Sequence, residues 1–209
     1  MKILSVTALP LPEVKVIRFA RFCDHRGSFA EVWRRSDFQQ HPDLAFLREV
    51  EFGQANESLS RPGTLRGLHF QWDPPMGKLV RTICGRMIDL VLDVRLGSPT
   101  FGHIVAHDMP AQPEQGEWIW VPPGFAHGNY FPSESIVEYF CTGHYNPECE
   151  ASISPLSPDI HWDLCAPALR ALIGEAAASA LVSDRDRAGM SVSAWQADPR
   201  ARHFVWQQT

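Results

Sequence analysis

The chain has 209 residues, of which 44% are hydrophobic, and this is enough to bury a sizeable core within one domain. The formal net charge of -5, without a clustered basic run, argues against a nucleic-acid partner. The cysteines are five, an odd number, and widely spaced, which indicates reduced thiols in a cytoplasmic protein. The N-terminal apolar run is broken by Pro10 and Pro12 and predicts neither a signal peptide nor a membrane span.

Short runs of β-branched and aromatic residues alternate with turn residues along most of the chain, which is typical of an all-β barrel or sandwich. The runs that predict strands are 14–19, 28–33, 79–83, 87–94, 118–121 and 136–142. Helical signal is confined to the alanine-rich segment 166–181. We therefore expect a single domain over residues 1–209, with short C-terminal helices and a tail, 190–209, that packs on the domain or contacts a partner.

Five residues in the middle of the chain have the spacing of the first cupin motif: Gly63, His69, Gln71, Lys78 and Gly85. The second cupin motif follows as Pro-Gly-Phe-Ala-His at 123–127. It would bring His127 to the same end of the barrel as His69. These motifs predict a jelly-roll cupin barrel with a polar site at its mouth.

Lys78 stands where a metal-binding cupin has a carboxylate. An ammonium cannot be a metal ligand and repels a divalent cation, so the substitution favours a site without metal and points to proton chemistry. Burying a lysine in an apolar strand without a partner or a function is also costly. The alternative is a metal-dependent cupin, such as a dioxygenase or sugar isomerase, with His69, Gln71 and His127 as ligands.

Several runs of sequence resemble the dTDP-4-dehydrorhamnose 3,5-epimerases and related nucleotide-sugar epimerases. In chain order they are DHRGSFAEVW (24–33), TLRGLHFQ (64–71), GKLVRTICG (77–85), LDVRLGSPTFG (92–102) and WVPPGFAHG (120–128). The similarity continues through Tyr139 and Tyr145 to LVSDRDRAG (181–189). It implies a homodimeric jelly-roll cupin that uses no metal or cofactor and acts on a dTDP-linked 4-keto deoxysugar.

The resemblance also implies roles for the matching residues. His69 would be the catalytic base with Asp186 as its carboxylate partner, Tyr139 the acid, and Lys78 a further catalytic residue in the site. The substrate would be bound by Arg66, His127 and Tyr145 in the sugar site, and by Arg26, Phe29, Glu31, Gln54 and Asn56 around the nucleotide. Some of these would come from the second subunit, so that the dimer shares its active sites.

The chemistry of these side chains supports the same reaction. Removing a proton beside a ketone builds negative charge on the carbonyl oxygen, which the Lys78 ammonium can stabilise by about 3–4 kcal/mol in the transition state. A carboxylate against His69 orients the imidazole and favours its charged form. Tyr139 stays protonated at neutral pH and can return a proton to the opposite face of the sugar.

The chain departs from the family pattern at two places near the expected site. Asn129, Tyr130 and Phe131 follow the second motif where a large apolar residue is usual, and Ala151 replaces an arginine. Epimerisation at only C3 or only C5 of a related sugar therefore stays open beside inversion at both carbons, as does a sugar-binding cupin without catalytic activity. Asp184 is an alternative partner for His69 if the segment around it is extended.

Overall fold

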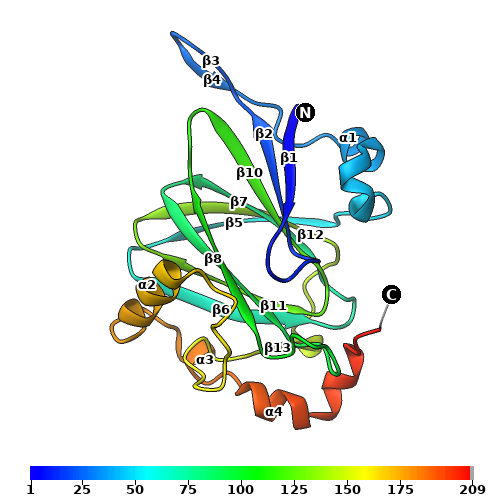
Figure 1. Cartoon of the computed structure of the whole chain (residues 1–209), viewed down its shortest axis with the longest axis vertical. Helices are drawn as coiled ribbons and strands as arrows, with labels where there is room; N and C mark the ends of the chain where they lie inside the picture. Colours follow the sequence, from blue (N-terminus) through cyan, green and yellow to red (C-terminus); the bar gives the residue numbers. More distant parts are fainter. Residues whose placement is uncertain (208–209) are drawn as a thin grey trace.

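Two antiparallel sheets face each other in the computed structural model, which describes residues 1–207 (Figure 1). One sheet has six strands in the order β1-β2-β10-β7-β12-β5, and the other has five in the order β13-β6-β11-β8-β9. The six are β1 (Ile3–Ala8), β2 (Lys15–Ala20), β10 (Gln115–Val121), β7 (Lys78–Cys84), β12 (Ser135–Cys141) and β5 (Gln54–Ser60). The five are β13 (Glu150–Ser152), β6 (Thr64–Gln71), β11 (Phe125–Phe131), β8 (Arg86–Asp93) and β9 (Ile104–Pro110). The expected all-β jelly roll is confirmed.

Short helices cover the outer faces of both sheets (Figure 1). The six-stranded sheet packs against α1 (Arg35–Gln40) and the 3-10 helix η1 (Pro42–Leu47). The five-stranded sheet packs against α2 (Pro167–Ala177) and α4 (Val192–Ala197). The remaining helical turns are η2 (Pro147–Cys149), α3 (Asp184–Arg187) and η3 (Pro199–His203). Among the described residues, none of the helices combines the length and apolar character that crossing a membrane requires.

The two-residue alternation of the strands divides the core into layers. On β8, Ile88, Leu90 and Leu92 point outward to the helices, whereas Met87 and Val91 point between the sheets. By the same alternation Asp89 and Asp93 also face the interior, and both are fully buried. The space between the sheets therefore holds buried carboxylates among apolar side chains.

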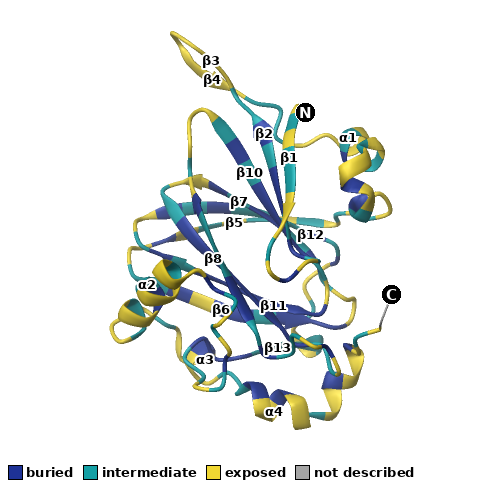
Figure 2. Ribbon diagram, in the orientation of Figure 1, coloured by how far each residue is buried: buried dark blue, intermediate teal, exposed yellow. Residues whose placement is uncertain are grey.

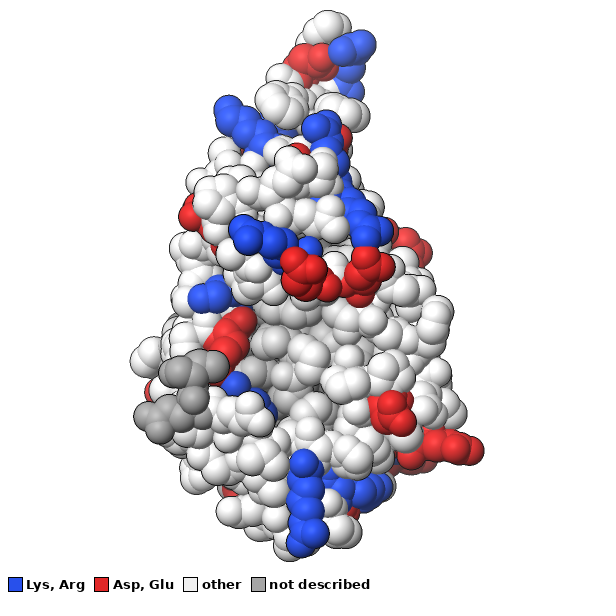
Figure 3. Space-filling view, turned by 90° about the vertical axis from the view of Figure 1, so that its right-hand side faces the viewer, with Lys and Arg blue, Asp and Glu red and all other residues white. Residues whose placement is uncertain are grey.

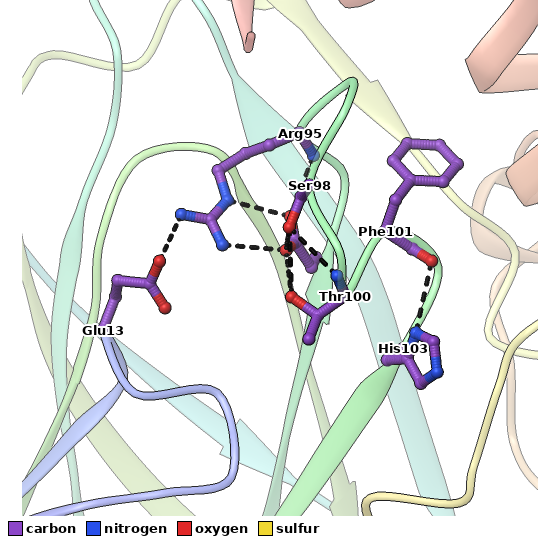
Figure 4. Close-up of polar contacts among 7 residues, drawn as sticks. Glu13, Arg95, Ser98, Thr100, Phe101 and His103 are labelled. Carbon is purple, nitrogen blue, oxygen red and sulfur yellow. Dashed lines mark hydrogen bonds and ion pairs between the residues drawn. The ribbon is translucent and has the colours of Figure 1, made fainter. Parts of the chain in front are cut away.

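The run at 92–102, one of the five that resemble the epimerases, forms a structural network around Asp93 (Figure 4). Arg95 donates to Asp93 through its backbone N–H, Nε and Nη2, and the hydroxyls of Ser98 and Thr100 donate to the same carboxylate. Arg95 also binds Glu13 at 2.6 Å, which ties this loop to the N-terminal segment. Both oxygens of Asp93 thus have donors.

The expected strand at 28–33 is wrong beyond Phe29. The chain forms only a short hairpin there, of β3 (Phe22–Asp24) and β4 (Gly27–Phe29), which projects from the body of the protein and is exposed along its length (Figure 2). The segment after it leaves the hairpin because it is held elsewhere: the Val32 carbonyl accepts a hydrogen bond from Trp118 Nε1 at 2.7 Å. The other five predicted strands lie on β2, β7, β8, β10 and β12.

The C-terminal segment packs on the domain as far as residue 206. Trp195 of α4 is fully buried, with its ring 4.6 Å from that of Phe70 and its Nε1 donating to the Val94 carbonyl at 2.9 Å. Further along, the backbones of Leu96 and Trp206 are hydrogen bonded. The two last residues of the expected tail, 208–209, lie outside the described residues.

Candidate active site

Strand alternation brings four of the expected site residues to one cavity between the sheets. His69 on β6 and His127 on β11 come from the five-stranded sheet, where they are direct cross-strand neighbours. Lys78 on β7 and Tyr139 on β12 come from the six-stranded sheet opposite. Lys78, His127 and Tyr139 each lie two positions from an apolar interior residue of their strand, such as Val80 for Lys78. His69 alternates with Leu68 and Phe70, which pack on the helix side of its sheet.

His69 and Asp186 form a hydrogen-bonded pair, with 2.6 Å between Nε2 and Oδ1. Asp186 lies on α3, whose first turn is capped by the Ser183 hydroxyl, and the backbone N–H of Gly67 donates to Oδ2 at 3.3 Å. Burial opposes ionisation of this carboxyl, but the bonds from His69 and Gly67 outweigh it and hold the pKa of Asp186 below its ordinary value. The pair therefore contains an ionised carboxylate against the imidazole.

Asp184 does not take part in this pair. The segment is a helical turn, not the extended chain considered above, and two residues along a helix point in different directions. Asp184 is exposed, whereas Asp186 is buried. Asp186, and not Asp184, is therefore the carboxylate partner of His69.

Lys78 and Tyr139 lie in the same cavity as His69. Burial lowers the pKa of Lys78, and this is opposed by the nearby Cys141 and Asp89. Burial also raises the pKa of Tyr139, which keeps its phenol protonated at neutral pH. The cavity thus offers a buried lysine side chain, a protonated hydroxyl and a carboxylate-oriented imidazole.

The cavity has two chambers, and His69, Lys78 and Tyr139 line both of them. The inner chamber has a volume of about 190 Å³ and is also lined by Ser58, Arg66, Gly67, His127, Gly128, Asn129 and Asp186. The outer chamber has a volume of about 420 Å³ and is also lined by Gln54, Asn56, Glu57, Phe70, Gln71, Met76, Cys141, Tyr145, Glu150 and Arg185. A chamber of the outer size can hold a sugar and part of a nucleotide.

The expected sugar-site and base-site residues of the strands are arranged around this opening. Arg66 is held by the Ser60 hydroxyl at 3.0 Å from its Nε. Gln54 donates to Asn56 Oδ1 at 3.0 Å and accepts from the backbone N–H of Tyr145 at the same distance. Tyr145 itself is half exposed at the rim. Gln54, Asn56 and Tyr145 thus line the outer chamber, and Arg66 lines the inner one.

Three expected nucleotide-binding residues do not reach the cavity of their own chain. Arg26 sits at the tip of the exposed hairpin, where charged side chains project from the protein in Figure 3, and pairs with Asp24. Phe29 is 69% exposed on the same hairpin. Glu31 follows it and binds the N-terminal ammonium and Arg34. Within one chain, these residues form no site with His69.

The alternative metal site is not supported by the donors present. His127 Nε2 is bonded to Asp89 at 2.8 Å, and the Gln71 amide is fully used by backbone groups of Pro74, His144 and Asn146. The ammonium of Lys78 lies beside both chambers. Across residues 1–207, no three His, Cys, Asp or Glu side chains are grouped as metal ligands.

The structure adds residues to the cavity that sequence reasoning missed. Asp89, behind His127, has no motif of its own and reads as one polar position in a buried strand. Cys141 follows Tyr139 by two positions, so strand alternation could have placed it at the cavity. Glu150 and Arg185 form an ion pair at the rim, and only the fold brings these distant positions together.

Comparison with known proteins gives a consistent result. The family model described as dTDP-4-dehydrorhamnose 3,5-epimerase matches residues 8–194. A dTDP-4-dehydrorhamnose 3,5-epimerase of Sinorhizobium fredii is 40% identical over 160 residues, which cover 74% of this chain and 78% of that protein. A dTDP-4-dehydro-6-deoxyglucose 3-epimerase of a Streptomyces species is 32% identical over 169 residues, covering 78% of this chain and 76% of the relative.

A solved structure has the same architecture. It is the dTDP-6-deoxy-D-glucose-3,5-epimerase of Legionella pneumophila in complex with dTDP-4-keto-L-rhamnose, with a TM-score of 0.80 and 31% identity over 98% of this chain and 99% of that one. A 3'-monoepimerase of Streptomyces bikiniensis in complex with dTDP-quinovose has a TM-score of 0.72 and 28% identity, covering 94% of this chain and 90% of that one. The fold is thus shared by enzymes that invert one carbon or two.

Proposed function

Because the chain belongs to the dTDP-4-dehydrorhamnose 3,5-epimerase family, we propose that it inverts C3 and C5 of a dTDP-linked 4-keto-6-deoxyhexose. The observation that carries this proposal is the His69–Asp186 pair, which shares one cavity with Lys78 and Tyr139. These are the groups that a proton abstraction beside a ketone requires.

His69 is the base in this reaction. Its side chain is 33% exposed, so the imidazole faces the cavity while Nε2 is bonded to Asp186. As the imidazole takes the proton from carbon, the C–H electron pair moves toward the ketone and an enolate forms. The positive charge that appears on His69 is stabilised by the Asp186 carboxylate.

Lys78 stabilises the enolate oxygen. An ammonium in a water-poor cavity interacts with a developing negative charge more strongly than in water, and such a donor is typically worth about 3–4 kcal/mol in the transition state. The same charge attracts the ketone oxygen in the ground state. Lys78 therefore also orients the sugar so that its acidic carbon faces His69.

Tyr139 returns the proton on the other face. It lies on the six-stranded sheet, whereas His69 lies on the five-stranded sheet, so a sugar ring between the sheets has one residue on each side. The phenol gives its proton to the enolate carbon, and the new C–H bond inverts the centre. The phenolate then regains a proton from solvent, and the His69 imidazolium releases one to solvent. Repeating the cycle at the second carbon completes a double epimerisation.

The proposal includes a homodimer with a shared active site. The β3–β4 hairpin presents two exposed aromatic rings, Phe22 and Phe29, on paired positions, together with the guanidinium of Arg26. Large apolar side chains on a projecting hairpin are unfavourable in water and suit an interface. The hairpin of one subunit would supply Phe29 to the thymine, and Arg26 to the diphosphate, of the other.

Mixing two inactive variants tests this arrangement. Phe29→Ala with Arg26→Ala disables the hairpin, and His69→Gln disables the base. If sites are shared, each variant alone is nearly inactive, and subunit exchange between them restores roughly a quarter to half of the activity, since heterodimers contain one intact site. A monomer by analytical ultracentrifugation, or no recovery after exchange, would rule out the shared site.

Inversion at one carbon is the second candidate, and the 3-epimerase relatives favour it. Incubation of the protein with dTDP-4-keto-6-deoxyglucose in heavy water, followed by mass spectrometry and proton NMR, distinguishes the two reactions. Deuterium at both C3 and C5 supports the 3,5-epimerase, and deuterium at one carbon supports the alternative. Binding of the sugar nucleotide without any uptake would indicate a sugar-binding cupin.

A further inference from the structure

Asp89 is a fully buried carboxylate that pairs with His127 and with no Lys or Arg side chain among the residues described by the structure. Its Oδ2 accepts hydrogen bonds from His127 Nε2 at 2.8 Å and from Asn129 Nδ2 at 3.1 Å. Its Oδ1 is also buried, and within residues 1–207 it has no hydrogen-bond partner. An orphaned carboxylate oxygen inside a protein is costly, and it is expected only where another group or a water compensates it.

Asp93 shows how the same strand compensates an equivalent charge. It is four positions further along β8, on the same face, and equally buried. Arg95 supplies a guanidinium to it, and Ser98 and Thr100 add hydroxyl donors (Figure 4). Asp89 instead has the His127 imidazole and the Asn129 amide as its donors, and no guanidinium.

Lys78 lies nearby and is the basic residue that could compensate the charge of Asp89. Its ammonium lines the inner chamber together with His127 and Asn129, the two residues that contact Asp89. Within residues 1–207, no side-chain hydrogen bond is among the interactions that shift the pKa of Lys78. The negative charge of Asp89 raises the pKa of Lys78 and so opposes the lowering caused by burial.

We propose that Asp89 is a positioning residue that keeps Lys78 in the ammonium form and directs it toward the carbonyl oxygen of the substrate. The inference rests on the proposed function, because the ammonium is needed only if an enolate forms. Asp89 acts through Lys78 and does not itself touch the sugar, since it lies behind the chamber wall made by His127 and Asn129.

The other charged or titratable groups of the cavity do not replace Asp89. Asp186 is bonded to His69, and Glu150 is paired with Arg185. Burial raises the pKa of the Cys141 thiol and of Tyr139, so both are neutral at pH 7. The remaining groups of this kind that line the two chambers are Glu57, Arg66, His127 and Tyr145. Of these, only Glu57 carries negative charge, and it is exposed and hence more strongly screened.

Trace acetylation as a function of pH measures the protonation of Lys78 without any substrate. The chain has only three lysines, Lys2, Lys15 and Lys78, so peptide mass spectrometry resolves each one, with Lys2 as an exposed internal reference. In Asp89→Asn, the midpoint of Lys78 labelling should fall by about one pH unit or more, as expected when an opposite charge at close range is removed. The midpoint of Lys2 should not move.

Cys141→Ser is the matched control. Cys141 is directly opposite Lys78 in the strand register and also acts to raise the pKa of Lys78, but its thiol is neutral at pH 7, so this change should move the Lys78 midpoint less than Asp89→Asn does. The basic limb of the kcat–pH profile should also move to lower pH in Asp89→Asn. An unchanged or raised Lys78 midpoint in Asp89→Asn would overturn the proposal, whatever the enzyme's substrate proves to be.

A second variant covers the case in which Asp89→Asn does not fold. The double variant Lys78→Met/Asp89→Asn removes both charges, so it should recover the folded state if the two charges compensate each other. Circular dichroism and urea unfolding report this directly. A double variant that is as unstable as Asp89→Asn alone would show that Asp89 has only a structural role.

Discussion

The Asp186→Asn variant isolates the carboxylate that holds His69. The amide preserves the shape of the side chain and removes a charge 2.6 Å from Nε2. Hydrogen bonds to charged groups are worth about 1.5–3 kcal/mol, and breaking a buried ion pair costs about 3–5 kcal/mol. Because the imidazole becomes cationic as the proton leaves carbon, a loss of about 3 kcal/mol in the transition state is expected, which is roughly 10²-fold in kcat.

The assay compares Asp186→Asn with Asp184→Asn, its neighbour on the exposed side of α3. Conversion of the 4-keto sugar nucleotide is followed by chromatography, and the dissociation constant for dTDP is measured by calorimetry. Asp186→Asn should lower kcat with little change in dTDP affinity, whereas Asp184→Asn should match the wild type within about twofold. A loss of activity confined to Asp184→Asn, or full activity in Asp186→Asn, would refute the assignment.

Three further predictions follow from the same structure. Lys78→Met should lower kcat by about 10²–10³-fold, because it removes the group that stabilises the enolate oxygen, and a folded variant with kcat within tenfold of the wild type would contradict a catalytic role. Trp195→Ala should reduce the unfolding free energy by about 3–5 kcal/mol, since it empties a fully buried position, and a change under 1 kcal/mol would show that the C-terminal helices do not stabilise the domain. Burial opposes ionisation of Asp93 and Asp186, yet their hydrogen bonds hold both pKa values below the ordinary 3.8. The ionised carboxylates therefore stabilise the folded state fully above that pH, and this contribution is lost as the pH falls through the folded-state pKa values. Urea unfolding should therefore show a loss of stability below a pH of about 4, and the Asp186→Asn protein should show a smaller one.

The barrel and the inward-facing site residues could be predicted from the sequence because strand periodicity and motif spacing are local properties. Tyr139 lies within a predicted strand and Lys78 directly before one, so the two-residue alternation predicts the side on which they lie. His69 and His127 lie on β6 and β11, which strand periodicity did not predict, and only the spacing of the two cupin motifs indicated them. The hairpin residues Arg26 and Phe29 were placed in a nucleotide site by resemblance alone. Within one chain they lie on an exposed hairpin away from the cavity, and their proposed contact with a second subunit is a long-range property that local sequence does not describe.

The remaining differences arise from tertiary contacts. Residues 28–33 have the composition of a strand, but beyond Phe29 the backbone binds Trp118 from another part of the chain. The turn that carries Asp186 contains four residues and is defined by the Ser183 cap, too short for helical periodicity to reveal. Asp89 looked like one polar residue in an apolar strand, and its environment required the packed sheets.

Isotope exchange by Tyr139→Phe tests the central claim, that His69 removes the proton and Tyr139 returns it on the opposite face. Because His69 is partly exposed, its abstracted proton can exchange with heavy water before it goes back. Tyr139→Phe should therefore incorporate deuterium at the reactive carbon with retained configuration and little inversion, whereas His69→Gln should incorporate none. Inversion at the wild-type rate by Tyr139→Phe, or deuterium uptake by His69→Gln, would contradict the account.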